Sequence, residues 1–262
     1  MAKYTQYVAE RISLLGVGVH AVNMTATLDV MAEAISQEGK GYICLAPAHN
    51  LMACRADEKL RTIFNRSALT VPDGMGTVWF LRLLGRRAGR VYGPDLMLAA
   101  CKHGATMGWR HFLLGGAPDV AETLAQRLRT AVPDLVVAGT YSPPFGEMTD
   151  IDTAGMLAQV NAARPDLIWV GLGSPKQERW MAEFRGRLDA PLLVGVGAAF
   201  DFLSGAKPQA PSWMQRSGME WLFRLLSEPR RLWKRYAAYP LFVLLVLAQW
   251  LGFARYPLEE GR

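Results

Sequence analysis

Short apolar runs alternate with amphipathic stretches along most of this 262-residue chain. Runs of about four to eight apolar residues predict buried strands, and apolar residues that recur every three or four positions predict helices. The segment 12–19 predicts a first strand, and Leu28, Met31 and Ile35 follow it at helical spacing. Further strands are predicted at 42–45, 68–71, 111–114, 135–138, 167–170 and 192–196, with helices at 51–65 and 120–128.

This order of strands and helices is typical of βαβ units, whose parallel sheet is covered by helices on both faces. We therefore expect an α/β fold with a Rossmann-like, mostly parallel sheet. Ligands of such sheets bind beyond the carboxyl ends of the strands. The segment 143–152 is predicted to be a long loop, and Thr149 or Asp150 is expected to cap the helix after it.

The pattern changes after residue 206. Residues 213–236 place cations and apolar side chains at helical spacing, which predicts an amphipathic basic helix bent at Pro229. We expect a Rossmann-like core at 1–206 and a membrane-binding appendage at 207–262.

Residues 236–254 contain no charged side chain, and this run approaches the ~20 residues that span a bilayer. Because Pro240, Gln249 and Gly252 interrupt it, we prefer an interfacial or partly inserted helix to a full span. A buried core helix or an oligomer contact is the third alternative.

Charge is concentrated in the same region. The net charge is +6, and seven cations stand against Glu220 and Glu228 between residues 207 and 236. Since Trp213, Trp221 and Trp233 are interleaved with these cations, an anionic membrane surface is favoured over nucleic acid. The three cysteines show no CxxC spacing, which disfavours a disulfide framework and a zinc site. The first ten residues lack the apolar stretch of a secretory signal.

Two glycine-containing turns follow predicted strands. Gly115 and Gly116 could expose backbone N–H groups to a phosphate, or they could simply form a tight turn. The second turn is more specific, because Lys176 could neutralise a diphosphate and Gln177 could hydrogen-bond a sugar or phosphate oxygen. Its alternative is a solvated first turn of a helix. This turn comprises Gly171, Gly173, Ser174, Lys176, Gln177 and Glu178.

Polar residues at other strand ends add candidates. Asp73, followed by Gly74, ends a predicted strand, where a carboxylate could act as a general base; an Asx-type turn is the default explanation. Arg90 could bind phosphate, or it could form a loop-holding ion pair with Asp95. His49 is not favoured as the base, since a lone histidine is more often a satisfied polar residue.

Four motifs in the same order resemble the WecG/TagA/CpsF glycosyltransferase family: 71–76, 90–96, 173–178 and 227–233. The resemblance extends from about residue 12 to about residue 236. It implies a Rossmann-like, inverting enzyme that transfers a sugar from a UDP-sugar donor to a polyprenyl-pyrophosphate-linked saccharide in bacterial surface-glycan synthesis. It also implies a basic C-terminal appendage that docks on the cytoplasmic leaflet and helps to complete the active site.

The resemblance also assigns residues. It gives Asp73 as the base, with Arg90 and Gln177 as substrate contacts. The family pattern is broken at Pro47, where an asparagine is expected, so a contact to the donor or acceptor is either lost or taken over by His49 or Asn50. The appendage residues expected to meet the acceptor or the membrane are Arg216, Arg224, Arg230, Arg231, Trp233 and Arg235.

Two other functions remain open: a non-catalytic membrane-bound protein that binds a nucleotide-sugar or lipid phosphate, and a nicotinamide-dependent oxidoreductase, which the missing GxGxxG motif disfavours. The glycosyltransferase reading requires no cofactor, and no metal because no DxD-like pair stands at a strand end. We expect a peripheral or monotopic protein at the cytoplasmic face of the bacterial inner membrane. The donor sugar, the linkage and self-association stay open.

Overall fold

A computed structural model describes residues 10–144 and 149–258. The described residues form two compact units, each assembled from separate stretches of the chain. The first unit contains residues 25–44 and 93–207, and the second contains residues 10–24, 45–92 and 208–258.

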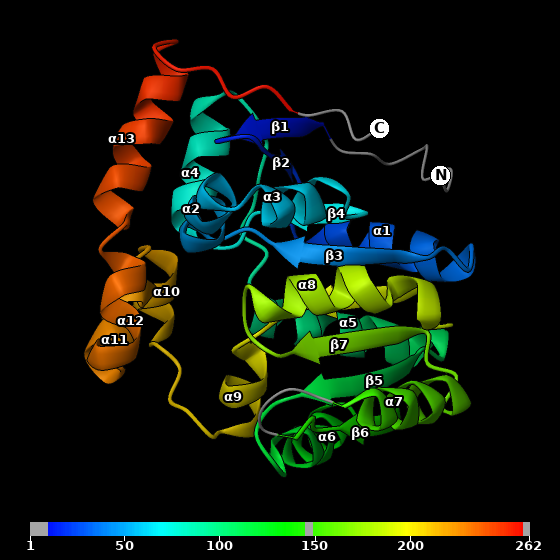
Figure 1. The fold of residues 1–262 in the computed structure, drawn as a ribbon. Coiled ribbons are helices and arrows are strands. Elements are labelled where there is room, and N and C mark those ends of the chain that lie inside the picture. The colour runs from blue at the N-terminus through cyan, green and yellow to red at the C-terminus, as the bar shows by residue number, and fades with distance from the viewer. Residues whose placement is uncertain (1–9, 145–148, 259–262) are drawn as a thin grey trace. The chain divides into compact units, whose positions relative to one another are not determined.

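A parallel sheet is the centre of the first unit. Its strands lie in the order β3-β8-β7-β5-β6. The arrowheads of β3, β5 and β7 point the same way in Figure 1, so the carboxyl ends of the strands meet at one edge. The strands are β3 (Gly41–Leu45), β5 (Arg110–Gly115), β6 (Val136–Tyr141), β7 (Leu167–Gly171) and β8 (Leu192–Gly195).

Helices cover both faces of this sheet. Helix α6 connects β5 to its outer neighbour β6. Helices α7 and α8 connect β6 to β7 and β7 to β8, so the chain moves across the sheet in the opposite direction. Because such crossovers are right-handed, α6 lies on the face opposite α7 and α8. The short helix α9 packs on α5 and α6. The predicted Rossmann-like α/β class is confirmed. The helices are α1 (Met24–Ser36), α5 (Gly93–Met107), α6 (Val120–Ala131), α7 (Asp150–Ala162), α8 (Lys176–Phe184), the 3₁₀ turn η1 (Arg185–Arg187) and α9 (Ala199–Ser204).

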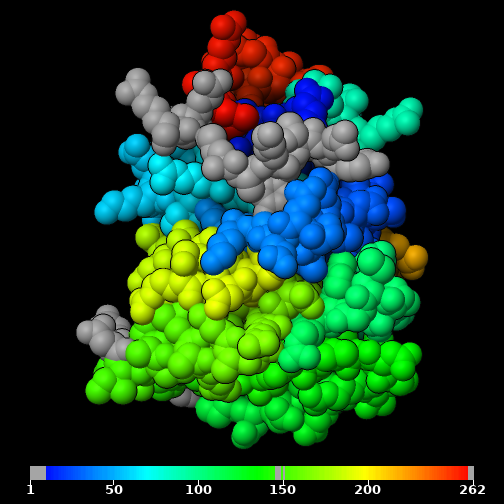
Figure 2. All heavy atoms as spheres, turned by 90° about the vertical axis from the view of Figure 1, so that its right-hand side faces the viewer, coloured from blue at the N-terminus to red at the C-terminus, as the bar shows by residue number. Residues whose placement is uncertain are grey.

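The interior of the first unit is mainly apolar and includes a buried histidine. Phe112, Trp169 and Leu193 are fully buried on the strands. The Trp169 Nε1–H donates to His111 Nδ1 at 3.0 Å, and burial lowers the pKa of His111 from 6.5 to about 4. Figure 2 shows the end of this unit at which the strands begin, where connecting segments in blue, yellow and green cover the sheet.

The second unit combines a hairpin, one short strand and two groups of helices. Its N-terminal part holds β1 (Arg11–Leu14), β2 (Val17–His20), α2 (Ala48–Ala56), α3 (Glu58–Asn65), β4 (Leu69–Val71) and α4 (Met75–Leu83). Its C-terminal part holds α10 (Ser212–Arg216), α11 (Glu220–Ser227), α12 (Pro229–Tyr236) and α13 (Tyr239–Trp250).

Two predicted elements near the N-terminus are divided in the structure. The single strand predicted at 12–19 is an antiparallel hairpin, because Leu15 and Gly16 turn the chain with φ of 54° and 87°. The single helix predicted at 51–65 is two helices. Asp57 separates them and caps the second, since its side chain accepts a hydrogen bond from Leu60 N at 3.0 Å.

The basic helix predicted at 213–236 is also wrong as a single element, because it is three helices. Gly218, with φ of 74°, lies between α10 and α11. Pro229 begins α12, where a missing N–H costs nothing, rather than bending a continuous helix. Farther upstream, the predicted cap of α7 is confirmed at Thr149, although residues 145–148 of that loop lie outside the described residues.

The apolar run at 236–254 forms α13, which packs on its own chain along one side. Phe242 and Val246 are buried, whereas Leu244 is 65% exposed. Gln249 fixes the helix to the hairpin: its Oε1 accepts from Leu15 N at 3.0 Å and its Nε2 donates to Ser13 O at 2.7 Å. Within residues 10–144 and 149–258, no helix is long and apolar enough to cross a membrane.

The C-terminal helices therefore share a compact unit with residues 10–24 and 45–92. The division into a core at 1–206 and an appendage at 207–262 stays a prediction.

Candidate active site

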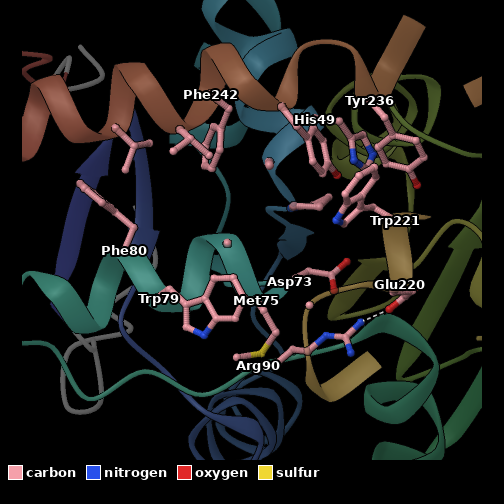
Figure 3. A pocket seen from close by; sticks show the side chains of 18 of the residues that line it. His49, Asp73, Met75, Trp79, Phe80, Arg90, Glu220, Trp221, Tyr236 and Phe242 are labelled. Atoms are coloured by element: carbon pink, nitrogen blue, oxygen red, sulfur yellow. Dashed lines mark hydrogen bonds and ion pairs between the residues drawn. The ribbon is translucent and has the colours of Figure 1, made fainter. Parts of the chain in front are cut away.

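A cavity of about 500 Å³ lies within the second unit (Figure 3). This volume falls within the range of small-molecule sites. The walls come from the start of α2, the β4–α4 turn, α4, the segment 90–92, α11 and the region from the end of α12 through α13. Segments far apart in the sequence thus form one site.

Asp73 stands on this wall directly after β4. Its position depends on Gly74, which adopts a φ of 88° before α4 begins; a Cβ there would meet nothing, so the backbone conformation is what favours glycine. The Val91 N–H donates to Pro72 O at 2.9 Å and ties the Asp73 turn to the segment that carries Arg90. The turn that would explain Asp73 without chemistry therefore also places its carboxylate in a cavity.

Arg90 lines the same cavity as Asp73 and is held from three sides (Figure 3). It forms an ion pair with Glu220, and its Nη1–H donates to Gln215 O at 3.2 Å. Its guanidinium also lies 4.0 Å from the centre of the Tyr92 ring. The Arg90 and Glu220 side chains are only 15% and 13% exposed, so the pair is largely shielded from water.

A second polar group lies around Arg224. Burial, together with the charges of Arg235 and Arg224, holds the pKa of His49 well below its usual value, so this ring is neutral at physiological pH. Burial raises the pKa of Tyr239, and Tyr236 and Asp73 raise it further. Neutral donors thus surround a cation, an arrangement that suits a phosphate oxyanion.

Arg224 itself stays charged. Burial opposes its charge, but Tyr236, Glu220, Tyr92 and Asp73 together raise the pKa of Arg224. The Asp73 carboxylate thus interacts electrostatically with the Arg224 guanidinium.

The rest of the cavity is apolar. Helix α4 contributes Trp79 and Leu83, and α13 contributes Phe242, Val243 and Leu247. Trp79, Leu83 and Val243 are 52%, 47% and 51% exposed, so this part opens to the outside. The cavity therefore has a polar end and an open apolar arm.

Several residues expected from the sequence share this cavity: His49, Asp73, Gly74, Arg90 and Arg224. Others lie outside its lining. Asn50 has a structural role, since its buried Nδ2–H donates to Leu45 O at 3.0 Å. Arg231 pairs with Glu228, and Arg235 acts on His49 through its charge. Arg216, Arg230 and Trp233 are exposed.

The glycine turns belong to the first unit, and close packing explains three of their glycines. A Cβ on Gly115 would lie 2.6 Å from the Gly171 carbonyl carbon, and one on Gly171 would lie 2.4 Å from Phe200 Cδ2. A Cβ on Gly116 would lie 2.8 Å from Val120 Cγ1. The tight-turn alternative therefore accounts for these glycines without a phosphate.

Gln177 and Glu178 differ from a solvated first turn, because both are buried. The Gln177 Nε2–H donates to Glu178 Oε1 at 3.0 Å. Gln177 Oε1 is buried and accepts no hydrogen bond from the described residues, so a ligand N–H or O–H could satisfy it. In the same turn, Ser174 is partly exposed, Lys176 is exposed and Gly173 adopts a φ of 77°. Asp95, in the first turn of α5, is also exposed. Residues of the first unit do not line the cavity around Asp73.

The sequence analysis missed several residues of the cavity. Glu220 was considered only as a countercharge within the basic segment. Tyr92 stood inside the motif 90–96 without an assigned role, and Tyr236 and Tyr239 belonged to no motif. Their role depends on contacts between segments that the sequence alone does not bring together.

Comparison with known proteins now defines the class: residues 12–256 match the glycosyl transferase WecG/TagA/CpsF family, so the protein is a glycosyltransferase. It is 30% identical over 229 residues, 87% of each chain, to the N-acetylglucosaminyldiphosphoundecaprenol N-acetyl-beta-D-mannosaminyltransferase of Bacillus subtilis strain 168. A protein of the same name from Bacillus spizizenii strain W23 is 30% identical over 190 residues, 72% of each chain. The chain belongs to the WecG/TagA/CpsF family, which confirms the resemblance of its four motifs.

Proposed function

We propose that the protein transfers a sugar from a UDP-sugar to a polyprenyl-diphosphate-linked saccharide, with inversion at the anomeric carbon. The main support is the cavity in which Asp73, Arg90 and Arg224 stand beside an apolar arm. The names of both relatives specify an acceptor in which a sugar, a diphosphate and a long isoprenoid are joined. A site for such an acceptor needs a base, cations and an apolar surface.

In the proposed reaction, Asp73 removes the proton from an acceptor hydroxyl. The hydroxyl oxygen forms a bond to the anomeric carbon on the face opposite UDP. The bond from that carbon to the UDP oxygen breaks, and its electron pair stays on the β-phosphate. Arg90 and Arg224 neutralise the diphosphate of the acceptor in the cavity.

We assign Gln177 a role in substrate binding, because its buried Oε1 can accept a hydrogen bond from a ligand hydroxyl or N–H. We also propose that the reaction needs no divalent metal. Equal transfer rates in EDTA and in added Mg²⁺ or Mn²⁺ would support this, and a loss of activity in EDTA that a metal restores would contradict it.

The direct test is a screen of UDP-sugars with an N-acetylglucosaminyl-diphosphate lipid, with the product detected by mass and its anomeric configuration by NMR. Asp73→Asn should slow transfer by about 10²–10⁴-fold, the usual contribution of a general base, without changing thermal unfolding. The exposed Asp189→Asn serves as the control. A near-normal rate in Asp73→Asn would exclude Asp73 as the base.

The other functions predict different results. A non-catalytic binding protein would bind UDP-sugar and release no UDP in the presence of the acceptor. A nicotinamide enzyme would change NADH fluorescence when a sugar nucleotide is added.

We further propose that α10–α13 dock as a peripheral surface on the anionic cytoplasmic leaflet. Large apolar side chains are exposed there beside cations: Trp233 is 54% and Leu244 65% exposed. The Trp233→Glu, Leu244→Glu double variant should lose cosedimentation with anionic vesicles. Ile151→Glu is the control, since this side chain of the first unit is 84% exposed. Unchanged sedimentation of the double variant would contradict this surface.

A further inference from the structure

The apolar arm of the cavity begins where the first turn of α4 meets α13. Gly76 lies in the first turn of α4, and a Cβ there would meet Phe242 Cε1 of α13 at 3.7 Å, an ordinary contact. The arm then continues between Trp79 and Leu83 on one side and Val243 and Leu247 on the other. A larger side chain at position 76 would project into this space.

Charge changes sharply along the cavity. Figure 3 shows Phe80 on one side of the view and the Arg90–Glu220 pair on the opposite side. Arg224 also lines the polar end, whereas α4 and α13 line the arm mainly with large apolar side chains. An occupant that complements both ends carries a phosphate group joined directly to a hydrocarbon.

We propose that this arm binds the first isoprene units of the acceptor lipid, with the diphosphate at Arg224 and Arg90; this inference rests on the function proposed above. A cavity of about 500 Å³ must also hold the diphosphate, so it accommodates only the beginning of a long polyprenyl chain. The exposed rim at Leu83, Val243 and Leu247 lets the remainder leave the protein. The chain then passes to the exposed apolar side of α13, where Leu244 lies.

The arm makes the lipid part of recognition rather than a passive anchor. Water leaves both the arm and the first isoprene units when they meet, which favours binding. An acceptor that has the same sugar and diphosphate but lacks the isoprenoid should therefore bind more weakly, even free in solution.

Calorimetric titration of the full chain tests this with four probes: farnesyl diphosphate, inorganic diphosphate, farnesol and dodecyl phosphate. Farnesyl diphosphate should bind far more tightly than inorganic diphosphate or farnesol. Gly76→Leu should weaken farnesyl diphosphate at least about tenfold, as expected when about two methylene groups lose their burial, and leave inorganic diphosphate unchanged. Gly155→Leu, at an exposed helical glycine of the first unit with open space around it, should change neither.

A second variant protects the test against misfolding of Gly76→Leu. Leu83→Glu places a carboxylate on the half-exposed rim, where it should fold normally and weaken farnesyl diphosphate selectively. Equal binding of farnesyl diphosphate in the wild type and both variants would overturn the proposal. Dodecyl phosphate that binds as tightly as farnesyl diphosphate, and loses the same factor in both variants, would overturn the isoprenoid assignment.

Transfer assays separate this inference from the proposed function. Wild-type protein that binds farnesyl diphosphate in the arm but transfers no sugar would refute the function and leave the lipid site standing. Transfer with the same KM for acceptors carrying a methyl or a farnesyl group would refute the lipid site and leave the function standing.

Discussion

The Arg90–Glu220 ion pair should contribute measurably to stability, unlike most ion pairs on a protein surface. Both side chains are at least 85% shielded, and Arg90 also donates to Gln215 O. Two unit charges about 4 Å apart attract by about 4 kcal/mol at an effective dielectric constant of 20. Desolvation and side-chain ordering offset part of this, which leaves an expected coupling energy of about 2 kcal/mol.

A double-mutant cycle measures this coupling directly. Urea unfolding of the wild type, Arg90→Gln, Glu220→Gln and the double variant gives the coupling energy as the departure from additivity. The Arg231–Glu228 pair is the matched control, because its side chains are 50% and 29% exposed and it should couple by less than about 1 kcal/mol. A coupling energy at Arg90–Glu220 no larger than that of the control would refute the reasoning.

Three further changes test other parts of the fold. His111 has a pKa of about 4 in the folded protein against 6.5 in the unfolded chain, so the free energy of unfolding should fall as the pH drops from 6.5 to 4. His111→Gln should reduce this loss by about 3 kcal/mol, measured by urea unfolding. An unchanged pH profile in the variant would contradict this prediction. Gly171→Ala should lower the free energy of unfolding by about 1–3 kcal/mol, because its Cβ would overlap Phe200. Gly155→Ala, in open space on a helix, should raise the free energy of unfolding slightly. Equal thermal midpoints for the two variants would refute this. Gln249→Ala removes two hydrogen bonds to the hairpin and should lower the free energy of unfolding by about 1–3 kcal/mol; a change below about 0.5 kcal/mol would show that α13 is held mainly by its apolar contacts.

The sequence predicted the sheet of the first unit well because its strands are short, continuous apolar runs bounded by turns. Strands 42–45, 111–114 and 167–170 each agree with the structure within a residue or two. The hairpin was missed because its turn, Leu15-Gly16, lies inside a run that is apolar throughout. The break in the basic segment did have a signal, since Gly218 follows a serine and glycine commonly ends helices, but the helical spacing of the cations on both sides outweighed it.

The residues of the candidate site that could be predicted stand at local turns or in sequence motifs. Asp73 and Gly74 form such a turn, and both line the cavity. An ion pair with nearby Asp95 was one of two sequence-based interpretations of Arg90, and the structure describes an ion pair between Arg90 and Glu220, 130 residues later. Such a contact depends on how helices pack, and neither periodicity nor spacing encodes it.

The cavity draws one wall from residues 47–92 and the other from residues 215–247. During synthesis the N-terminal residues leave the ribosome and begin to fold first. A growing chain thus presents Asp73 long before α13 exists to face it. Under the proposed function, acceptor binding therefore begins only after residues 215–247 have been made, and a nascent chain stopped before residue 215 contains Asp73 but lacks the second wall of the cavity.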